Sequence, residues 1–274
     1  MRFCITLPAW MSRIERRIAA RHLAWFGVAW LVVCFAIPVA LLLVESFEFG
    51  GDLLSNYRRV FERVWLMTLV RTFSYALWTT VVCLPLGFVF SYYVAFKTKR
   101  RVAFLALVAV PLWVAIIVRY MGVALFFLPT GPVVSVFGTD FGVLFSARGV
   151  ILGLTSALLP FAILPIYASL RAIDEETVAA SRVLGASGPR TVYEVVLPMS
   201  RPGIVAATLL VYILAAGSFL APELLGGPGN FMAANVVGTS GFGAAFAVVF
   251  TGSLLLIVAV FDRVVDITTT IGDL

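Results

Sequence analysis

The feature that most constrains this chain is a series of long segments that contain no charged residue. Residues 23–44, 72–96 and 149–170 are uncharged, and each is close to the roughly 20 apolar residues that an α-helix needs to cross a bilayer. Residues 202–222 and 244–261 form two further runs of this kind. In the whole chain 62% of the residues are hydrophobic and only 12% are charged, which is too few charged residues for the surface of a soluble protein.

A sixth apolar run starts at Val102 and continues to about Leu128, although Arg119 interrupts it near its middle. All the runs are continuously apolar and do not alternate, so they indicate helices and not the strands of a barrel. Basic residues precede the first run, as in a signal peptide, but its apolar core is too long and no small-residue cleavage site follows. The sequence therefore predicts an all-α integral membrane protein with six transmembrane helices.

Basic residues are concentrated on alternate connections between these runs, and this bias predicts the orientation. The connections on one side carry Arg2, Arg13, Arg16, Arg17, Arg21, Lys97, Lys99, Arg100, Arg101, Arg171, Arg182, Arg190 and Arg201, whereas those on the other side carry only Arg58, Arg59, Arg63 and Arg148. Because cytoplasmic loops hold the excess of Lys and Arg, both termini are predicted to be cytoplasmic. The net charge of +6 then reflects membrane topology and not nucleic-acid binding.

The chain divides into three parts on this basis. Residues 1–22 are predicted to be a cytoplasmic N-terminal segment, 23–265 a transmembrane domain with a long connection at 171–201, and 266–274 a cytoplasmic tail. Trp10, Ile14 and Ile18 are four residues apart, as in an amphipathic helix that lies on the lipid surface. A merely positive flank of the first span explains the same residues, and both interpretations remain open.

Catalytic and metal-binding patterns are missing from the sequence. The three cysteines, Cys4, Cys34 and Cys83, are scattered without metal-ligand spacing, and the one histidine, His22, has no partner for catalysis. No Gly-x-x-x-x-Gly-Lys motif for nucleotide phosphates is present. We expect neither a metal site nor a cofactor bound by this chain, and no enzymatic activity.

The long connection has the most ordered pattern outside the apolar runs. Asp174 or Thr177 can cap a first helix, and Gly185 is expected to end it. A second helix is predicted over residues 189–196, with Leu197-Pro198 as its end. Because a solvated linker rarely has such a regular apolar stripe, the pattern indicates a surface that binds another molecule.

Residues 173–187 resemble the coupling loop of ABC importer permeases. The signature of that loop is Glu-Ala-Ala, three residues, Gly, nine residues, Ile, one residue and Leu-Pro. With Gly185 as the glycine, Leu197-Pro198 matches, and Val195 stands at the isoleucine. The triplet falls on Ala179-Ala180-Ser181, where Ala179 replaces the glutamate and only the middle alanine is kept. This difference affects one contact of the loop, a carboxylate that faces the ATPase.

The resemblance implies a role for the loop and a set of partners. Its coupling residues would be Ala179, Ala180, Ser181, Arg182, Gly185, Val195, Leu197 and Pro198. The partners would be a second permease subunit of different sequence, a dimer of cytoplasmic ATPase subunits that binds ATP and Mg²⁺, and a periplasmic or lipid-anchored solute-binding protein. The implied location is the bacterial inner membrane, which this chain would cross several times.

Other fragments are similar to one branch of this superfamily. Residues 220–228 look like the segment after the fifth span of spermidine/putrescine-type permeases, and Asn56-Tyr57, 111–113 and 159–161 fit the same branch. A polyamine is therefore the first expectation for the substrate. The branch also includes importers of opines or amino-acid derivatives, of thiosulfate and of ferric iron, which remain alternatives. A secondary transporter would need ion-coupling residues and inverted repeats, neither of which is evident.

Four residues are candidates for the substrate path. Glu223 follows Pro222 and precedes a glycine-rich stretch, and a helix broken in this way can line a cavity at membrane depth. Phe219 and Trp113 can add cation–π contacts. Arg119 either lines the pore or pairs with a carboxylate, or it lies at the outer interface because the span ends nearby. For Glu223, an interfacial position without substrate contact remains the alternative.

Overall fold

A computed structural model describes residue 25 and residues 27–47, 52–238 and 240–265 of the chain. No β-strand occurs in these ranges. The predicted N-terminal segment 1–22 and the tail 266–274 lie outside the described residues, and so does the amphipathic pattern at Trp10, Ile14 and Ile18.

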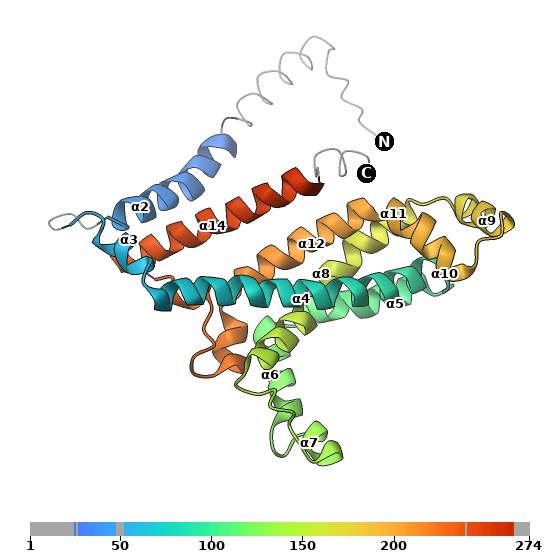
Figure 1. The fold of residues 1–274 in the computed structure, drawn as a ribbon, viewed down its shortest axis with the longest axis horizontal. Helices are drawn as coiled ribbons and strands as arrows, with labels where there is room; N and C mark the ends of the chain where they lie inside the picture. Colours follow the sequence, from blue (N-terminus) through green and yellow to red (C-terminus); the bar gives the residue numbers. More distant parts are fainter. Residues whose placement is uncertain (1–24, 26, 48–51, 239, 266–274) are drawn as a thin grey trace, which may run out of the picture.

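The described chain is a series of helices (Figure 1). They are η1 (Val32–Ala36), α2 (Ile37–Glu45), α3 (Ser55–Val60), α4 (Arg63–Phe96), α5 (Arg101–Ala109), η2 (Val110–Trp113), α6 (Ile116–Phe127), α7 (Pro132–Phe137), α8 (Ala147–Arg171), α9 (Glu175–Val183), α10 (Gly188–Thr191), η3 (Val192–Val196), α11 (Leu197–Met199), α12 (Arg201–Ala216), η4 (Pro222–Gly226), α13 (Ala233–Val236) and α14 (Gly241–Val265).

Five helical stretches in the described part are long and apolar enough to cross a membrane: Gly27–Glu45, Arg63–Phe96, Ile116–Phe137, Ala147–Arg171 and Gly241–Arg263. The segments Gly188–Met199 and Arg201–Ala216 meet at a bend of 69°, and they make a sixth span if they are counted together. The prediction of an all-helical protein with about six spans is confirmed.

Helix α8 is the centre of the bundle, with α4 and α12 against it and α6 near its first half. Its most apolar stretch is 61% buried inside the protein, whereas that of Gly27–Glu45 is 0% buried. Small residues allow the close approach: Gly87 of α4 faces Ala162 of α8, and the Ser91 hydroxyl donates to the Ile163 carbonyl at 2.9 Å. Such contacts suit membrane helices, which gain little from apolar burial against each other in lipid.

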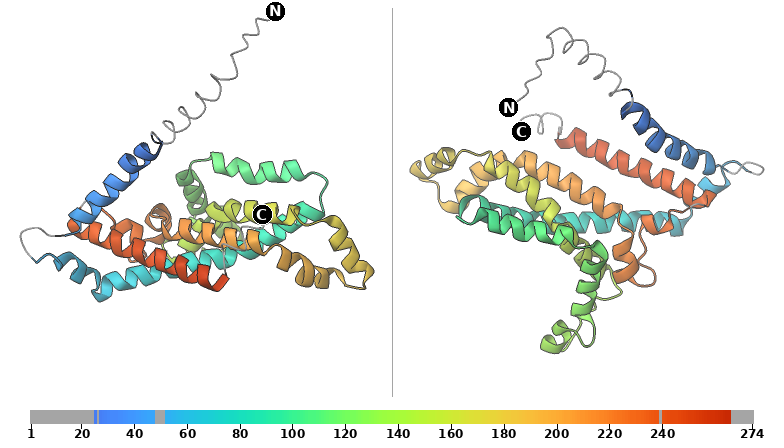
Figure 2. Two further views of the ribbon diagram at one scale, coloured as in Figure 1. Left: turned by 90° about the horizontal axis from the view of Figure 1, so that it is seen from above. Right: turned by 180° about the vertical axis from the view of Figure 1, so that it is seen from behind.

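Helix α14 lies beside α2 and α3, and Figures 1 and 2 show α2 and α14 together at one edge of the bundle. Aromatic pairs join α14 to α4. The rings of Trp65 and Phe242 are 4.8 Å apart, and those of Phe73 and Phe250 are 5.9 Å apart. These ring contacts pack α14 against the first half of α4.

The prediction of one continuous third span was wrong. α5 is followed by a short 3-10 turn, η2, after which Val114 and Ala115 have extended backbones. Pro111 lacks an N–H group and cannot continue the α-helical hydrogen bonds. α6 therefore starts anew at Ile116, and Trp113 at the break is 91% exposed.

Two other boundaries differ from the sequence prediction. The second long helix, α4, begins at Arg63, so Arg71 lies inside it and not at the end of a span. The fifth helix, α12, ends at Ala216 and does not reach Pro222, because Gly217 and Ser218 interrupt it. The chain then turns into η4, which carries Glu223.

Candidate functional site

The first candidate site is the helical connection between α8 and α12, at one end of the bundle (Figure 1). α9 begins directly after Asp174 and ends before Gly185, which has a φ of 90°. The N–H group of Ala186 donates to the Ser181 carbonyl at 3.1 Å, the bond that closes a helix on a left-handed glycine. The predicted end of the first helix at Gly185 is confirmed.

The second helix of this connection is longer than predicted. It runs without interruption from Gly188 to Met199, so Leu197-Pro198 does not end it. The middle turn, η3, is a π-helix in which the Leu197 N–H group bonds to the Val192 carbonyl. This wider turn accommodates Pro198, which has no N–H group and whose ring would collide with a carbonyl in a regular α-turn. The sharp bend follows at Ser200.

The two helices of the connection 171–201 contact each other through buried and half-buried residues. Val178 is buried, and the Ser181 hydroxyl donates to the Val178 carbonyl at 2.9 Å and to the Thr191 hydroxyl at 3.2 Å. The last turn of α9 is open: Val183 is 87% and Leu184 88% exposed. These two side chains form an apolar tip that nothing in the described part of the chain covers.

The structure places the predicted coupling residues along both helices. Ala179 and Ala180 are exposed on α9, while Val195, Leu197 and Pro198 on the second helix are half-buried. The side chain of Arg182 lies outside the described part of the structure. The pattern found the two helices and the glycine, but it missed the exposed Tyr193 on the second helix.

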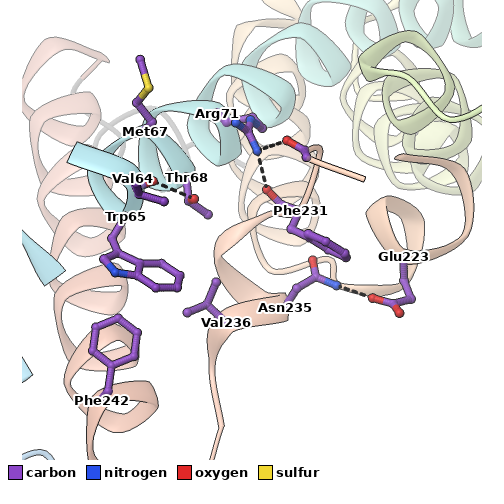
Figure 3. A pocket seen from close by; sticks show the side chains of 11 residues that line it. Val64, Trp65, Met67, Thr68, Arg71, Glu223, Phe231, Asn235, Val236 and Phe242 are labelled. Atoms are coloured by element: carbon purple, nitrogen blue, oxygen red, sulfur yellow. Dashed lines mark hydrogen bonds between the residues drawn. The ribbon is translucent and has the colours of Figure 1, made fainter. Parts of the chain in front are cut away.

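The second candidate site is a cavity of about 670 Å³ at the start of α4 (Figure 3). Residues from four helices, α4, η4, α13 and α14, and from the loop between η4 and α13 line it: Val64, Trp65, Met67, Thr68, Arg71, Glu223, Gly229, Phe231, Asn235, Val236 and Phe242. Glu223 is the only acidic residue among them. Its carboxylate oxygen Oε2 accepts a hydrogen bond from Asn235 Nδ2 at 3.1 Å.

Polar side chains of α4 bind the loop after η4, residues 229–231, which forms one wall of this cavity. Arg71 Nη1 donates to the carbonyls of Gly229 and Phe231, as Figure 3 shows. One turn further along α4, the Tyr75 hydroxyl donates to Asn230 Oδ1 at 2.7 Å. The guanidinium of Arg71 therefore bonds to backbone carbonyls of this loop. Within the described residues it forms no ion pair with Glu223.

Only one of the four predicted substrate-path residues lines this cavity, namely Glu223. Phe219 and Arg119 line a different cavity, of about 300 Å³, between α6, α8 and the end of α12. Trp113 lines neither of the two. The aromatic residues that line the cavity of Glu223 are instead Trp65, Phe231 and Phe242, and Figure 3 shows Trp65 and Phe242 on the side opposite the carboxylate.

The sequence did contain a signal for the wall on α4. Thr68, Arg71, Thr72 and Tyr75 follow a spacing of three, four and seven residues, which puts polar groups on one face of a helix. This face extends beyond the uncharged run 72–96, which starts directly after Arg71, so the run alone did not reveal it.

Arg119 lies in the first turn of α6 and contacts the neighbouring helix α8. Its Nη1 atom donates to the carbonyl of Ala157 at 3.0 Å, and Ala157 lies near the middle of α8. The Nε atom is buried and has no hydrogen-bond partner among the residues that the structure describes. Within the described residues no carboxylate pairs with Arg119. The hydrogen bond to the Ala157 carbonyl therefore stabilises the Arg119 guanidinium between α6 and α8.

Comparison with known proteins identifies the family. The model of the family described as binding-protein-dependent transport system inner membrane component matches residues 18–269. The chain is a member of this family. Spermidine/putrescine transport system permease protein PotB of Escherichia coli (strain K12) is 31% identical to this permease over 258 residues, which cover 86% of the permease and 94% of PotB.

Two further likenesses support the assignment. Inner membrane ABC transporter permease protein YdcU of Escherichia coli (strain K12) is 30% identical over 260 residues, 83% of the permease and 82% of YdcU. A crystal structure of a bacterial ABC transporter involved in the import of the acidic polysaccharide alginate matches with a TM-score of 0.77. The match covers 94% of the permease and 99% of that chain at 15% sequence identity, so it shows a shared fold.

These findings confirm the family that the coupling-loop resemblance implied. The permease is a multi-pass component of the inner membrane and the non-catalytic transmembrane subunit of an ABC importer. A permease of this kind works with a partner permease, a separate ATPase and a solute-binding protein.

Proposed function

We propose that the permease forms half of the pore of a polyamine importer, with a putrescine- or spermidine-like cation as substrate. The observation that carries this proposal is the carboxylate of Glu223 in a cavity whose walls include Trp65, Phe231 and Phe242. The similarity to spermidine/putrescine permeases over most of the chain supports the same substrate class.

The chemistry of the cavity suits an organic cation. A carboxylate attracts an ammonium group at about 4 Å by about 1–4 kcal/mol for effective dielectric constants of about 80 to 20. Aromatic rings can add about 0.5–2 kcal/mol by cation–π contact. Arg71 opposes this attraction less than a free guanidinium would, because its Nη1 atom is engaged by the carbonyls of Gly229 and Phe231.

Replacement of Glu223 by Gln tests the proposal. We expect uptake of labelled putrescine or spermidine by the complete transporter in proteoliposomes to fall about tenfold, which corresponds to about 1.4 kcal/mol. The substitution removes the charge and keeps the shape, so the amount of folded permease should not change. Glu62→Gln is the control, because Glu62 is exposed just before α4 and does not line the cavity. Uptake of an anion by the wild type, or undiminished polyamine uptake by Glu223→Gln, would contradict the proposal.

A second candidate substrate is an amino-acid derivative with one ammonium and one carboxylate group. Arg71 favours it, because the guanidinium lines the same cavity as Glu223 and can receive an anionic group. The same proteoliposomes distinguish the two classes. A diamine as the competing solute should inhibit polyamine uptake, whereas competition by an ω-amino acid of equal length would favour the second candidate.

We also propose how the complete transporter is arranged. The second half of the pore is a different permease chain, and both termini of this chain face the cytoplasm. Two ATPase subunits bind ATP and Mg²⁺, and a periplasmic or lipid-anchored protein delivers the solute. The connection 171–201 docks on an ATPase subunit through its apolar tip, Val183 and Leu184, together with Tyr193. Their high exposure supports this docking surface.

Ala179→Glu tests the alignment of this loop with the family signature. Ala179 is exposed on α9, so a carboxylate at this position stays in solvent until the ATPase docks. We expect assembly with the ATPase to be retained, or to be tighter by up to about 1 kcal/mol if the new group meets a cation. Co-purification of the ATPase with each permease variant measures the effect. A large loss of assembly would show that the triplet is misplaced on residues 179–181.

A further inference from the structure

We infer that Asn235 is a positioning residue that orients the carboxylate of Glu223 toward the substrate cavity. Asn235 Nδ2 donates to Glu223 Oε2 at 3.1 Å and to the Phe219 carbonyl at 2.9 Å, and Oδ1 accepts from the Met232 N–H group at 3.2 Å. The inference rests on the proposed function, because it concerns the residue that we propose to meet the cation.

The partners of Asn235 fix the direction of its amide. Two oxygen atoms face the nitrogen end, and one N–H group faces the oxygen end. A flipped amide would place its oxygen against two acceptors and its NH₂ group against a donor. Asn235 is therefore a hydrogen-bond donor toward Glu223, and neither an aspartate nor an apolar residue can replace it in this role.

Asn235 is itself anchored to α4 through its own short helix. The N–H group of Ala233, in the first turn of α13, donates to Thr72 Oγ1 at 2.7 Å. On the approach to α13, Arg71 holds the carbonyls of Gly229 and Phe231. α4 thus fixes the position of α13, and Asn235 on α13 bonds to the Glu223 carboxylate on the separate turn η4, as Figure 3 shows.

The hydrogen bond from Asn235 engages one of the two carboxylate oxygens of Glu223. Oε2 of Glu223 is held by Asn235, while no group within the described part of the chain bonds to Oε1. A charge-assisted bond of this type is stronger than a bond between neutral groups, and it restricts the rotation of an otherwise exposed side chain. Oε1 can then bind an ammonium group with little further loss of side-chain conformational entropy, because the carboxylate is already ordered.

Two substitutions at Asn235 test the inference in the complete transporter. Asn235→Leu has a similar shape and removes the donor, and Asn235→Asp places a negative charge against Oε2. We expect the polyamine transported per ATP hydrolysed to fall about fivefold for Asn235→Leu, which corresponds to about 1 kcal/mol, and at least as much for Asn235→Asp. The melting temperature of each purified variant shows whether the permease remains folded.

Asn230→Leu, in the loop that leads to α13, is the matched comparison. Asn230 bonds to Tyr75 and to the Gly226 carbonyl, but it does not reach Glu223. We expect a smaller loss of transport per ATP from Asn230→Leu than from Asn235→Leu. An equal loss would mean that Asn235 only anchors the loop, and it would overturn the inference.

A double-mutant cycle separates positioning from general stability. If Asn235 acts through the carboxylate, Asn235→Leu should have little further effect when Glu223→Gln is already present. The same fivefold loss in both backgrounds would overturn the inference. Wild-type uptake by Glu223→Gln would overturn the proposed function, whereas a loss in Glu223→Gln with normal transport in Asn235→Leu would overturn the inference alone.

Discussion

Gly185→Val is expected to lower uptake by the complete transporter by about 30-fold, with membrane insertion intact. Gly185 has a φ of 90°, a conformation that costs an L-residue about 1–2 kcal/mol and is especially unfavourable for a β-branched side chain. A cost of 2 kcal/mol corresponds to a factor of about 30. Relief of this strain would break the bond from Ala186 to Ser181 and would displace the exposed Val183 and Leu184.

The comparison variant is Gly185→Asn, because asparagine tolerates left-handed backbone better than other side chains. A Cβ atom at this position meets no atom of the described residues within 4 Å, so crowding against them does not explain a loss. Uptake and ATP turnover stimulated by the binding protein should be measured together for both variants. Wild-type values for Gly185→Val would show that the connection 171–201 does not couple ATP hydrolysis to transport.

Gly203→Val is expected to destabilise the folded permease by about 3 kcal/mol or to prevent its accumulation. A Cβ atom on Gly203 would lie 2.5 Å from Ser169 Cβ, 2.6 Å from the Pro165 carbonyl oxygen and 3.1 Å from Ile166 Cα. Two of these are backbone atoms of α8, which cannot rotate away. α12 and α8 would have to separate, and this contact is central to the bundle.

The yield of monodisperse permease after detergent extraction and its melting temperature measure this effect. Gly252→Val on α14 is the control, since a Cβ atom there meets nothing within 4 Å in the part of the chain that the structure describes. We expect the control to be extracted and to melt like the wild type. If Gly203→Val behaves in the same way, the close packing of α8 and α12 through this glycine is not important for stability.

The sequence by itself determined the features that depend on local chemistry. An uncharged run of sufficient length must form a helix in lipid, because each backbone polar group needs a partner within the segment. The left-handed conformation of Gly185 follows from a helix that ends at a glycine. The spacing from Gly185 to Leu197-Pro198 was sufficient to indicate the family, since it is a property of the chain and not of its packing.

Only the tertiary structure decided where the broken helices end and which residues share the cavity. Pro111 predicts an interruption of the hydrogen bonds, but the extended backbone at Val114 and Ala115 depends on how α6 packs beside α8. Arg71 and its carbonyl partner on Gly229 are 158 residues apart in the sequence. Contacts over such a separation are set by the close packing of the bundle, and no local pattern assigned Trp65, Arg71 or Asn235 to the surroundings of Glu223.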